Sequence, residues 1–211
     1  NVISFRRKHI DNFLERNNKY IKGDVLDVGG KKINRRGTFN PSTINYNSWK
    51  YLNTDPKTKP DFVANANDIP LSNNTINTII FCETLEYIEN PLEVFSEFQR
   101  ILIPGCYILD TCPFLSPLHG DKEFDKYRYT KTSLLDLFKH NKFEVVSLKE
   151  MGSTSDVIYD LLRVQLSYHR NLKNIILLRI LNLLKPIFLF LSGSENEYIN
   201  TGYSFVLKKN D

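Results

Sequence analysis

A carboxylate stands beside a glycine turn near the start of the chain. The stretch DVLDVGG at residues 24–30 places Asp27 two residues before Gly29, which Gly30 follows directly. The apolar run VLDV at 25–28 is typical of a short buried strand, so the turn comes at its carboxyl end. Glycines let a ligand approach the backbone closely. The pattern therefore predicts a ligand site at the end of this strand.

The position of Asp27 favours a ligand that carries positive charge. A dinucleotide loop has the spacing Gly-x-Gly-x-x-Gly, whereas this chain continues GGKKINRR and lacks the third glycine. A buried carboxylate beside two phosphates would also be repelled by roughly several kcal/mol at low dielectric. A ligand with an ammonium and a sulfonium group would instead be attracted to the carboxylate. We expect such a cationic amino-acid end beside Asp27.

Short apolar strands alternate with amphipathic helices along the chain. This alternation predicts an α/β fold of the Rossmann-like, doubly wound kind, with a mainly parallel seven-stranded sheet and helices on both faces. The ligand of such a sheet lies outside the carboxyl ends of its strands. The expected strands are 25–28, 49–54, 61–64, 75–82, 105–111, 143–149 and 203–209, and two of the expected helices are 4–16 and 131–140.

Another helix is expected to begin at Pro91, with Asn90 as its N-cap. Pro104-Gly105 is expected to end this helix. Its predicted apolar face consists of Leu92, Phe95, Phe98 and Leu102.

The composition fits one globular domain over residues 1–211, with an N-terminal helix within 1–20 and a helical insertion or lid at 151–200 before the last strand. The net charge is only +4 and the basic residues are scattered, so no nucleic-acid partner is expected. Cysteine spacing predicts reduced thiols, no metal site and a cytoplasmic location. These cysteines are Cys82, Cys106 and Cys112.

The longest apolar segment is IILLRILNLLKPIFLFL at residues 175–191. A membrane span needs about 20 apolar residues, and this segment is shorter and interrupted by Arg179 and by Lys185-Pro186. The pattern predicts two helices that pack on the domain or form a lid. The alternative is a surface that contacts a membrane or a lipid-linked substrate.

Four segments, in order, resemble the motifs of the class I S-adenosylmethionine-dependent methyltransferases over roughly residues 20–150. VLDVGG is similar to the family's first motif, and YLNTD to the end of its second strand. Residues 64–91 resemble its adenine loop, fourth strand and next helix start, and ILIPGCYILDT resembles the approach to its fifth strand. The resemblance implies S-adenosyl-L-methionine as cofactor. The residues that it implies for cofactor binding are Asp27, Gly29, Gly30, Asp55, Asn65, Ala66 and Glu83.

Chemistry supports some of these assignments, and at other positions this chain has a residue that differs from the family's usual one. Asp55 has two oxygens, so it can accept hydrogen bonds from both ribose hydroxyls. Asn65 stands where the family often has Asp, and it can still accept from the adenine amino group. Residues 31–48 are typical of a loop, in which Arg35 and Arg36 are interpreted as solvated charges or as contacts to an anionic substrate.

Catalytic candidates follow the fourth and fifth strands. Methyl transfer requires the acceptor at attack distance, and proton removal can assist it. Tyr87 stands where related oxygen-methylating enzymes often have His, although its reference pKa near 10 makes it a poor base. His119 lies in the segment 113–130, which resembles a loop of methyltransferases linked to glycan or cell-surface assembly, and it is a candidate base or substrate contact. In that loop, Asp125 and Arg128 are expected to form an ion pair.

The sequence therefore predicts S-adenosylmethionine-dependent methyl transfer to a small-molecule or glycan-precursor acceptor, with oxygen favoured. The runner-up is an NAD-dependent oxidoreductase on a similar sheet, and a third interpretation is a non-catalytic binding module with this fold. The oligomeric state is left open.

Overall fold

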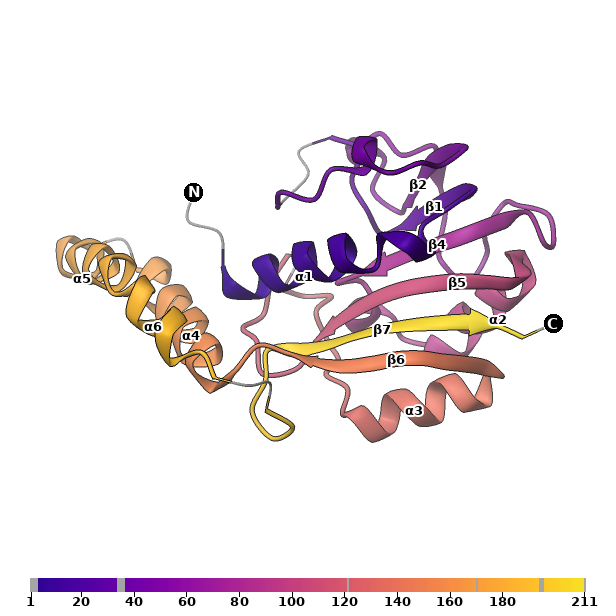
Figure 1. Ribbon diagram of the computed structural model, residues 1–211. Helices are drawn as coiled ribbons and strands as arrows, with labels where there is room; N and C mark the ends of the chain where they lie inside the picture. Colours follow the sequence, from indigo (N-terminus) through magenta and orange to yellow (C-terminus); the bar gives the residue numbers. More distant parts are fainter. Residues whose placement is uncertain (1–3, 34–36, 121, 170, 194–195, 211) are drawn as a thin grey trace.

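A mixed seven-stranded sheet forms the centre of the computed structural model (Figure 1), which describes residues 4–33, 37–120, 122–169, 171–193 and 196–210. Its strands lie in the order β3-β2-β1-β4-β5-β7-β6. Neighbouring strands from β3 to β5 are parallel, whereas β7 is antiparallel to both β5 and β6. The predicted fold class is confirmed. Arg35 and Arg36 lie outside the described residues. The strands are β1 Asp24–Val28, β2 Ser48–Asn53, β3 Phe62–Val63, β4 Ile76–Cys82, β5 Leu102–Pro113, β6 Phe143–Met151 and β7 Gly202–Lys209.

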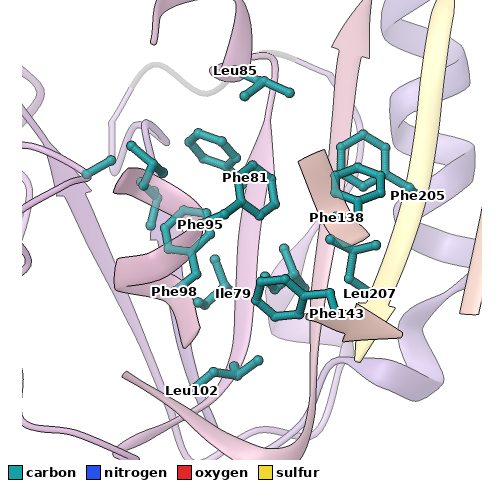
Figure 2. Packing of buried hydrophobic residues seen from close by; sticks show 14 of the residues in the cluster. Ile79, Phe81, Leu85, Phe95, Phe98, Leu102, Phe138, Phe143, Phe205 and Leu207 are labelled. Atoms are coloured by element: carbon teal, nitrogen blue, oxygen red, sulfur yellow. The ribbon is translucent and has the colours of Figure 1, made fainter. Parts of the chain in front are cut away.

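Helices cover both faces of the sheet because successive strand residues alternate between the faces. In β4, Ile79 and Phe81 pack with the residues of α2 and α3, while Ile80 packs with those of α1. Figure 2 shows the aromatic part of the first cluster, where Phe81 lies beside Phe95 and Phe98 of α2. The helices are α1 Phe5–Arg16, α2 Pro91–Ile101, α3 Lys131–His140, α4 Thr154–Tyr168, α5 Leu172–Leu183 and α6 Lys185–Leu191.

The boundary between α2 and β5 differs from the prediction. The helix ends at Ile101, and Pro104-Gly105 lies inside the following strand. The register shifts there, since Leu102 pairs with Ile76 but Tyr107 pairs with Thr78. Gly105 has φ +75°, a conformation that glycine adopts without strain, so the Pro-Gly pair forms a bulge in β5 and does not stop the helix.

The apolar face of α2 also differs from the predicted one. Phe95 and Phe98 are fully buried as expected, but Leu92 is 42% exposed and Leu102 belongs to β5. Val94 and Ile101 complete the buried face. Leu92 is not buried because, as the second residue of the helix, it points away from the buried stripe. Val94, Phe98 and Ile101 define that stripe at spacings of three and four.

Replacing Phe95 by Ala should lower the free energy of unfolding by about 3–5 kcal/mol, because its ring is fully buried and contacts four other aromatic rings. Urea unfolding measures this change. Leu92→Ala in the same helix is the matched control and should change stability by about 0.5 kcal/mol or less. Equal effects of the two substitutions would contradict the packing described above.

Candidate active site

The glycine turn after β1 has no room for side chains. Gly29 has φ +79°, and a Cβ atom there would lie 2.3 Å from Oγ1 of Thr84. A Cβ atom at Gly30 would lie 2.1 Å from a carboxylate oxygen of Asp27. Asn53, at the end of β2, donates from Nδ2 to the carbonyl oxygens of both glycines at 3.0 Å. The turn is therefore fixed by its neighbours and leaves bare backbone for a ligand.

Asp55 lies beside this turn and is exposed. Its Oδ1 accepts a hydrogen bond from the backbone N–H of Lys57 at 2.9 Å and so caps the short 3-10 helix Pro56–Thr58. Its own N–H donates to Oδ1 of Asn53 at 2.9 Å. Asn53 thus holds both the glycine turn and Asp55, which sets the distance between them.

One large cleft collects the predicted site residues. It has a volume of about 1890 Å³. Since ligand pockets typically measure about 300–1,000 Å³, the cleft has room for a cofactor and an acceptor together. It lies outside the carboxyl ends of β1, β2 and β4, as expected for this sheet. Its lining includes every predicted site residue: Asp27, Gly29, Gly30, Asp55, Asn65, Ala66, Glu83, Tyr87 and His119.

Glu83 is held by an arginine that the sequence did not single out. Arg6 of α1 donates from Nε to Oε2 of Glu83 at 3.1 Å and also contacts Oε1 through Nη2. Thr111 donates to the same Oε1 at 3.1 Å. Burial raises the pKa of Glu83, but the charge and hydrogen bonds of Arg6 outweigh it, so the pKa lies below the ordinary value. Glu83 is therefore ionised and already paired.

His119 lies between two carboxylates. Its Nε2 is 3.0 Å from Oε1 of Glu86, and its Nδ1 is 3.3 Å from Oδ2 of Asp125. Its backbone N–H donates to the same Oδ2 at 2.9 Å. The predicted ion pair is confirmed, because Arg128 donates from Nη2 to Oδ2 of Asp125 at 3.0 Å. Asp125 therefore connects Arg128 to the backbone and the imidazole of His119.

The same surroundings shift the pKa values of His119 and Glu86. Burial lowers the pKa of His119, but the carboxylates of Glu86, Glu83 and Asp125 outweigh it and raise the pKa above its ordinary value. Burial raises the pKa of Glu86 to about 7, and the charge of Glu83 acts in the same direction. The pKa values of both members of the His119–Glu86 pair are thus raised by their surroundings.

Tyr87 contacts His119 through its hydroxyl group, which donates to the backbone carbonyl of His119 at 2.9 Å. Burial raises the pKa of this phenol further above its ordinary value. The adjacent Gly120 has φ +61°, and a Cβ atom there would lie 2.4 Å from the Tyr87 hydroxyl oxygen. These contacts support a role for Tyr87 in positioning the His119 loop.

Two buried carboxylates, Glu86 beside His119 and Asp110 of β5, were missed by the sequence reasoning. Glu86 is fully buried, and the only hint was its spacing of three from Glu83 in ETLE. Asp110 is also fully buried in β5, and its carboxylate has no hydrogen-bond partner among the described residues. Burial raises the pKa of Asp110 well above its ordinary value, and the charges of Glu86 and Glu83 act in the same direction.

Glu83, Glu86 and His119 also form a grouping that could hold a metal ion, since their ligand atoms lie within 4.8 Å of one another. The sequence predicted no metal site. The guanidinium of Arg6 already binds both oxygens of Glu83, so a cation here would compete with that ion pair.

Residues 39–109 match a family model described as a methyltransferase domain. This segment contains β2, β3, β4 and α2, and with them Asp55, Asn65, Ala66, Glu83 and Tyr87. No curated protein matches the sequence.

Solved structures show the same fold at low sequence identity. An S-adenosylmethionine-dependent methyltransferase from Clostridium acetobutylicum has a TM-score of 0.61 at 10% identity, over 97% of this chain and 92% of that one. Phosphoethanolamine N-methyltransferase 2 of Haemonchus contortus, in complex with S-adenosyl-L-methionine, has a TM-score of 0.59 at 14% identity, over 95% of this chain and 53% of that one. A cyclase has a TM-score of 0.61 at 14% identity, over 95% of this chain and 81% of that one.

Such identities show the fold alone, and the cyclase illustrates that one fold can host several reactions. The match to the methyltransferase family model decides between the functions that the sequence left open, in favour of methyl transfer. The bare glycine turn and the carboxylates Asp27 and Asp55 fit S-adenosyl-L-methionine as the cofactor. Residues 39–109 therefore match a methyltransferase domain, and the chain has the fold of S-adenosylmethionine-dependent methyltransferases.

Proposed function

We propose that this enzyme transfers a methyl group to a hydroxyl oxygen of a small-molecule or glycan-precursor acceptor, with His119 as the general base. The observation that carries the proposal is the position of His119, which lines the same cleft as the residues that fit the cofactor and is backed by two carboxylates. When bound, S-adenosyl-L-methionine supplies an electrophilic methyl group on a sulfonium. The protein must hold the acceptor oxygen in line with it and accept the acceptor proton.

The carboxylates make His119 a stronger base than an isolated imidazole, because they raise its pKa. Both ring nitrogens face carboxylates and are buried in the free protein. Proton transfer therefore requires the contact between Nε2 and Glu86 to open toward the acceptor. The hydrogen bond from Tyr87 to the His119 carbonyl keeps the backbone in place during that movement.

The acceptor class rests on two features. The segment 113–130, which carries His119, resembles a loop of methyltransferases linked to glycan or cell-surface assembly. The cleft is also lined by Arg163 of α4, whose charge suits an anionic acceptor such as a sugar phosphate. We extend the proposal to contact with a lipid-linked acceptor through residues 175–191, and to a cytoplasmic location, which the three free cysteines support.

Asp55→Ala should weaken binding of S-adenosylhomocysteine by about 1.5–3 kcal/mol, because it removes a charged acceptor from the ribose. Calorimetric titration measures the change. Asp68→Ala, in the neighbouring turn and outside the cleft lining, is the matched control and should leave affinity unchanged. Unfolding midpoints check that the loss of the Asp55 cap has not unfolded the variant. Unchanged affinity in folded Asp55→Ala would refute the ribose assignment.

His119→Ala should lower turnover by about 100-fold or more, the typical effect of removing a general base, while S-adenosylhomocysteine affinity stays intact. Turnover is followed as release of S-adenosylhomocysteine with a panel of hydroxyl and amine acceptors. The control is His140→Ala at the exposed end of α3. Loss of cofactor binding in His119→Ala would mean that the loop at residues 113–130 contacts the cofactor and not the acceptor. Methyl transfer to amines alone would show that the acceptor atom is nitrogen and not oxygen.

Glu86→Gln should move the acid limb of the pH–rate profile to lower pH. The reactive base is neutral His119, so activity rises as pH passes the pKa of His119. The Glu86 carboxylate raises that pKa, and the amide of the Glu86→Gln variant carries no charge to do so. In the variant, His119 therefore stays neutral down to a lower pH than in the unchanged protein. Glu144→Gln, on the exposed part of β6, should leave the profile in place. An unmoved acid limb in Glu86→Gln would show that His119 is not the titrating group.

A further inference from the structure

Helices α5 and α6 carry a large exposed apolar surface, and we call these two helices the apolar arm. The arm projects from the end of the sheet beyond α4 (Figure 1). Leu172, Leu183 and Phe190 are 74%, 79% and 88% exposed. In α5 only Leu181 is buried, and α6 has no buried residue. An exposed apolar surface that is contiguous on two helices marks an interaction site.

The arm is attached by one narrow stripe. Leu181 and Phe188 pack against Tyr159 of α4 and Phe5 of α1. The Tyr159 hydroxyl donates to Oδ1 of Asn182 at 2.9 Å. The less exposed positions of α5 recur at spacings of three and four, and the apolar side chains between them face outward over most of its circumference. A protein partner covers one stripe of a helix, whereas lipid surrounds an apolar helix over a wide arc.

Basic residues predominate in the segment that contains the arm. Residues 161–193 contain five Arg or Lys and no Asp or Glu, although the whole chain has 28 basic and 24 acidic residues. Apolar side chains interspersed with basic ones match an interface of acyl chains and anionic headgroups. A second copy of the chain would bring the same positive charge to the contact and be repelled.

The dimensions of the arm fit a position on a membrane surface better than a transmembrane span. No single described helix is long and apolar enough to cross a membrane; α5 and α6 reach that length only together, and a bend of 49° separates them. A bilayer core is about 30 Å thick, whereas the 12 residues of α5 extend about 18 Å at 1.5 Å per residue. The short length of each helix and the bend between them favour a position at the membrane surface over a straight crossing.

We propose that the apolar arm docks this enzyme on the surface of an anionic lipid bilayer, with its apolar side chains at the acyl boundary and its basic residues at the headgroups. Asp160, Arg163 and Val164 of α4 line the active-site cleft, so docking brings the cleft mouth close to the membrane. The part of this inference that names a lipid-linked acceptor rests on the proposed function. The docking itself does not, and it can be measured without turnover.

The test is cosedimentation of the full chain with vesicles of phosphatidylcholine alone and of phosphatidylcholine with phosphatidylglycerol. We expect binding to the vesicles with phosphatidylglycerol, weaker binding to phosphatidylcholine alone, and release as salt is raised. The double variant Leu183→Glu/Phe190→Glu should bind at least about tenfold more weakly, and Lys173→Gln/Arg179→Gln should lose the preference for anionic lipid.

Matched controls lie on α3, at a distance along the chain from the arm. Leu135→Glu, which replaces a 40% exposed leucine, and Lys139→Gln should bind vesicles like the unchanged protein. All variants are first checked for unchanged thermal unfolding midpoints, so that unfolding is excluded. A protein that binds vesicles but transfers no methyl group would overturn the proposed function and leave the docking intact.

Four results would overturn the docking. One is the absence of vesicle binding by the unchanged protein, and another is equal binding by Leu183→Glu/Phe190→Glu. The third is a lipid-independent dimer, seen by sedimentation velocity, that Phe190→Glu dissociates, because the arm would then be covered by a second copy. Resistance of the bound protein to alkaline extraction would instead indicate a broken span and would also contradict surface docking.

Discussion

The ion pair between Arg6 and Glu83 is the interaction on which the cleft depends. Arg6 is only 6% exposed, and its guanidinium lies where the carboxyl ends of β4, β6 and the start of β7 meet. Removing one partner of such a buried pair costs about 3–5 kcal/mol, because it leaves the other charge unpaired. The backbone N–H groups of Phe5 and Arg6 donate to Asp160 of α4 at 3.2 and 3.0 Å. The pair and these bonds fix α1 between the sheet and the C-terminal helices.

Around this pair, neighbouring carboxylates have different protonation states because their partners differ. Glu83 is paired with Arg6 and has a lowered pKa. Burial raises the pKa of Glu86 to about 7, and it raises the pKa of Asp110 well above its ordinary value. Asp125 is paired with Arg128, and that pairing outweighs burial and lowers its pKa. Carboxyl groups with raised and with lowered pKa values thus lie close together in sequence and structure. Such separation of pKa values is characteristic of sites that move protons.

Local signals allowed much of the fold to be predicted from sequence. The helix Lys131–His140 begins and ends as its Thr130 cap and apolar spacing indicate, and the strands follow their β-branched runs. The bulge at Pro104-Gly105 was missed because the same dipeptide is typical of a helix end, and only pairing with β4 distinguishes the two.

The candidate site was predictable where it follows the strand ends, and not where it depends on distant contacts. Asp27 lies at the end of β1 and Asp55 just after β2, and topology alone brings these two strand ends together. The partner of Glu83 is 77 residues away in the chain, and no local pattern specifies it. Likewise, the periodicity of 175–191 indicates helices but not how much of their surface the domain covers, because coverage is a property of tertiary packing.

The place of β7 in the sheet has a consequence for the order in which the sheet becomes complete. It is the last described strand in the sequence, yet it lies between β5 and β6 and pairs with both along its length. During synthesis, β5 and β6 therefore emerge with open edges that have no partner until residues 202–209 leave the ribosome. Open edges are sites of mispairing. A nascent or truncated chain without residues 202–209 would present two such edges at once, so the folding of this sheet depends on that segment.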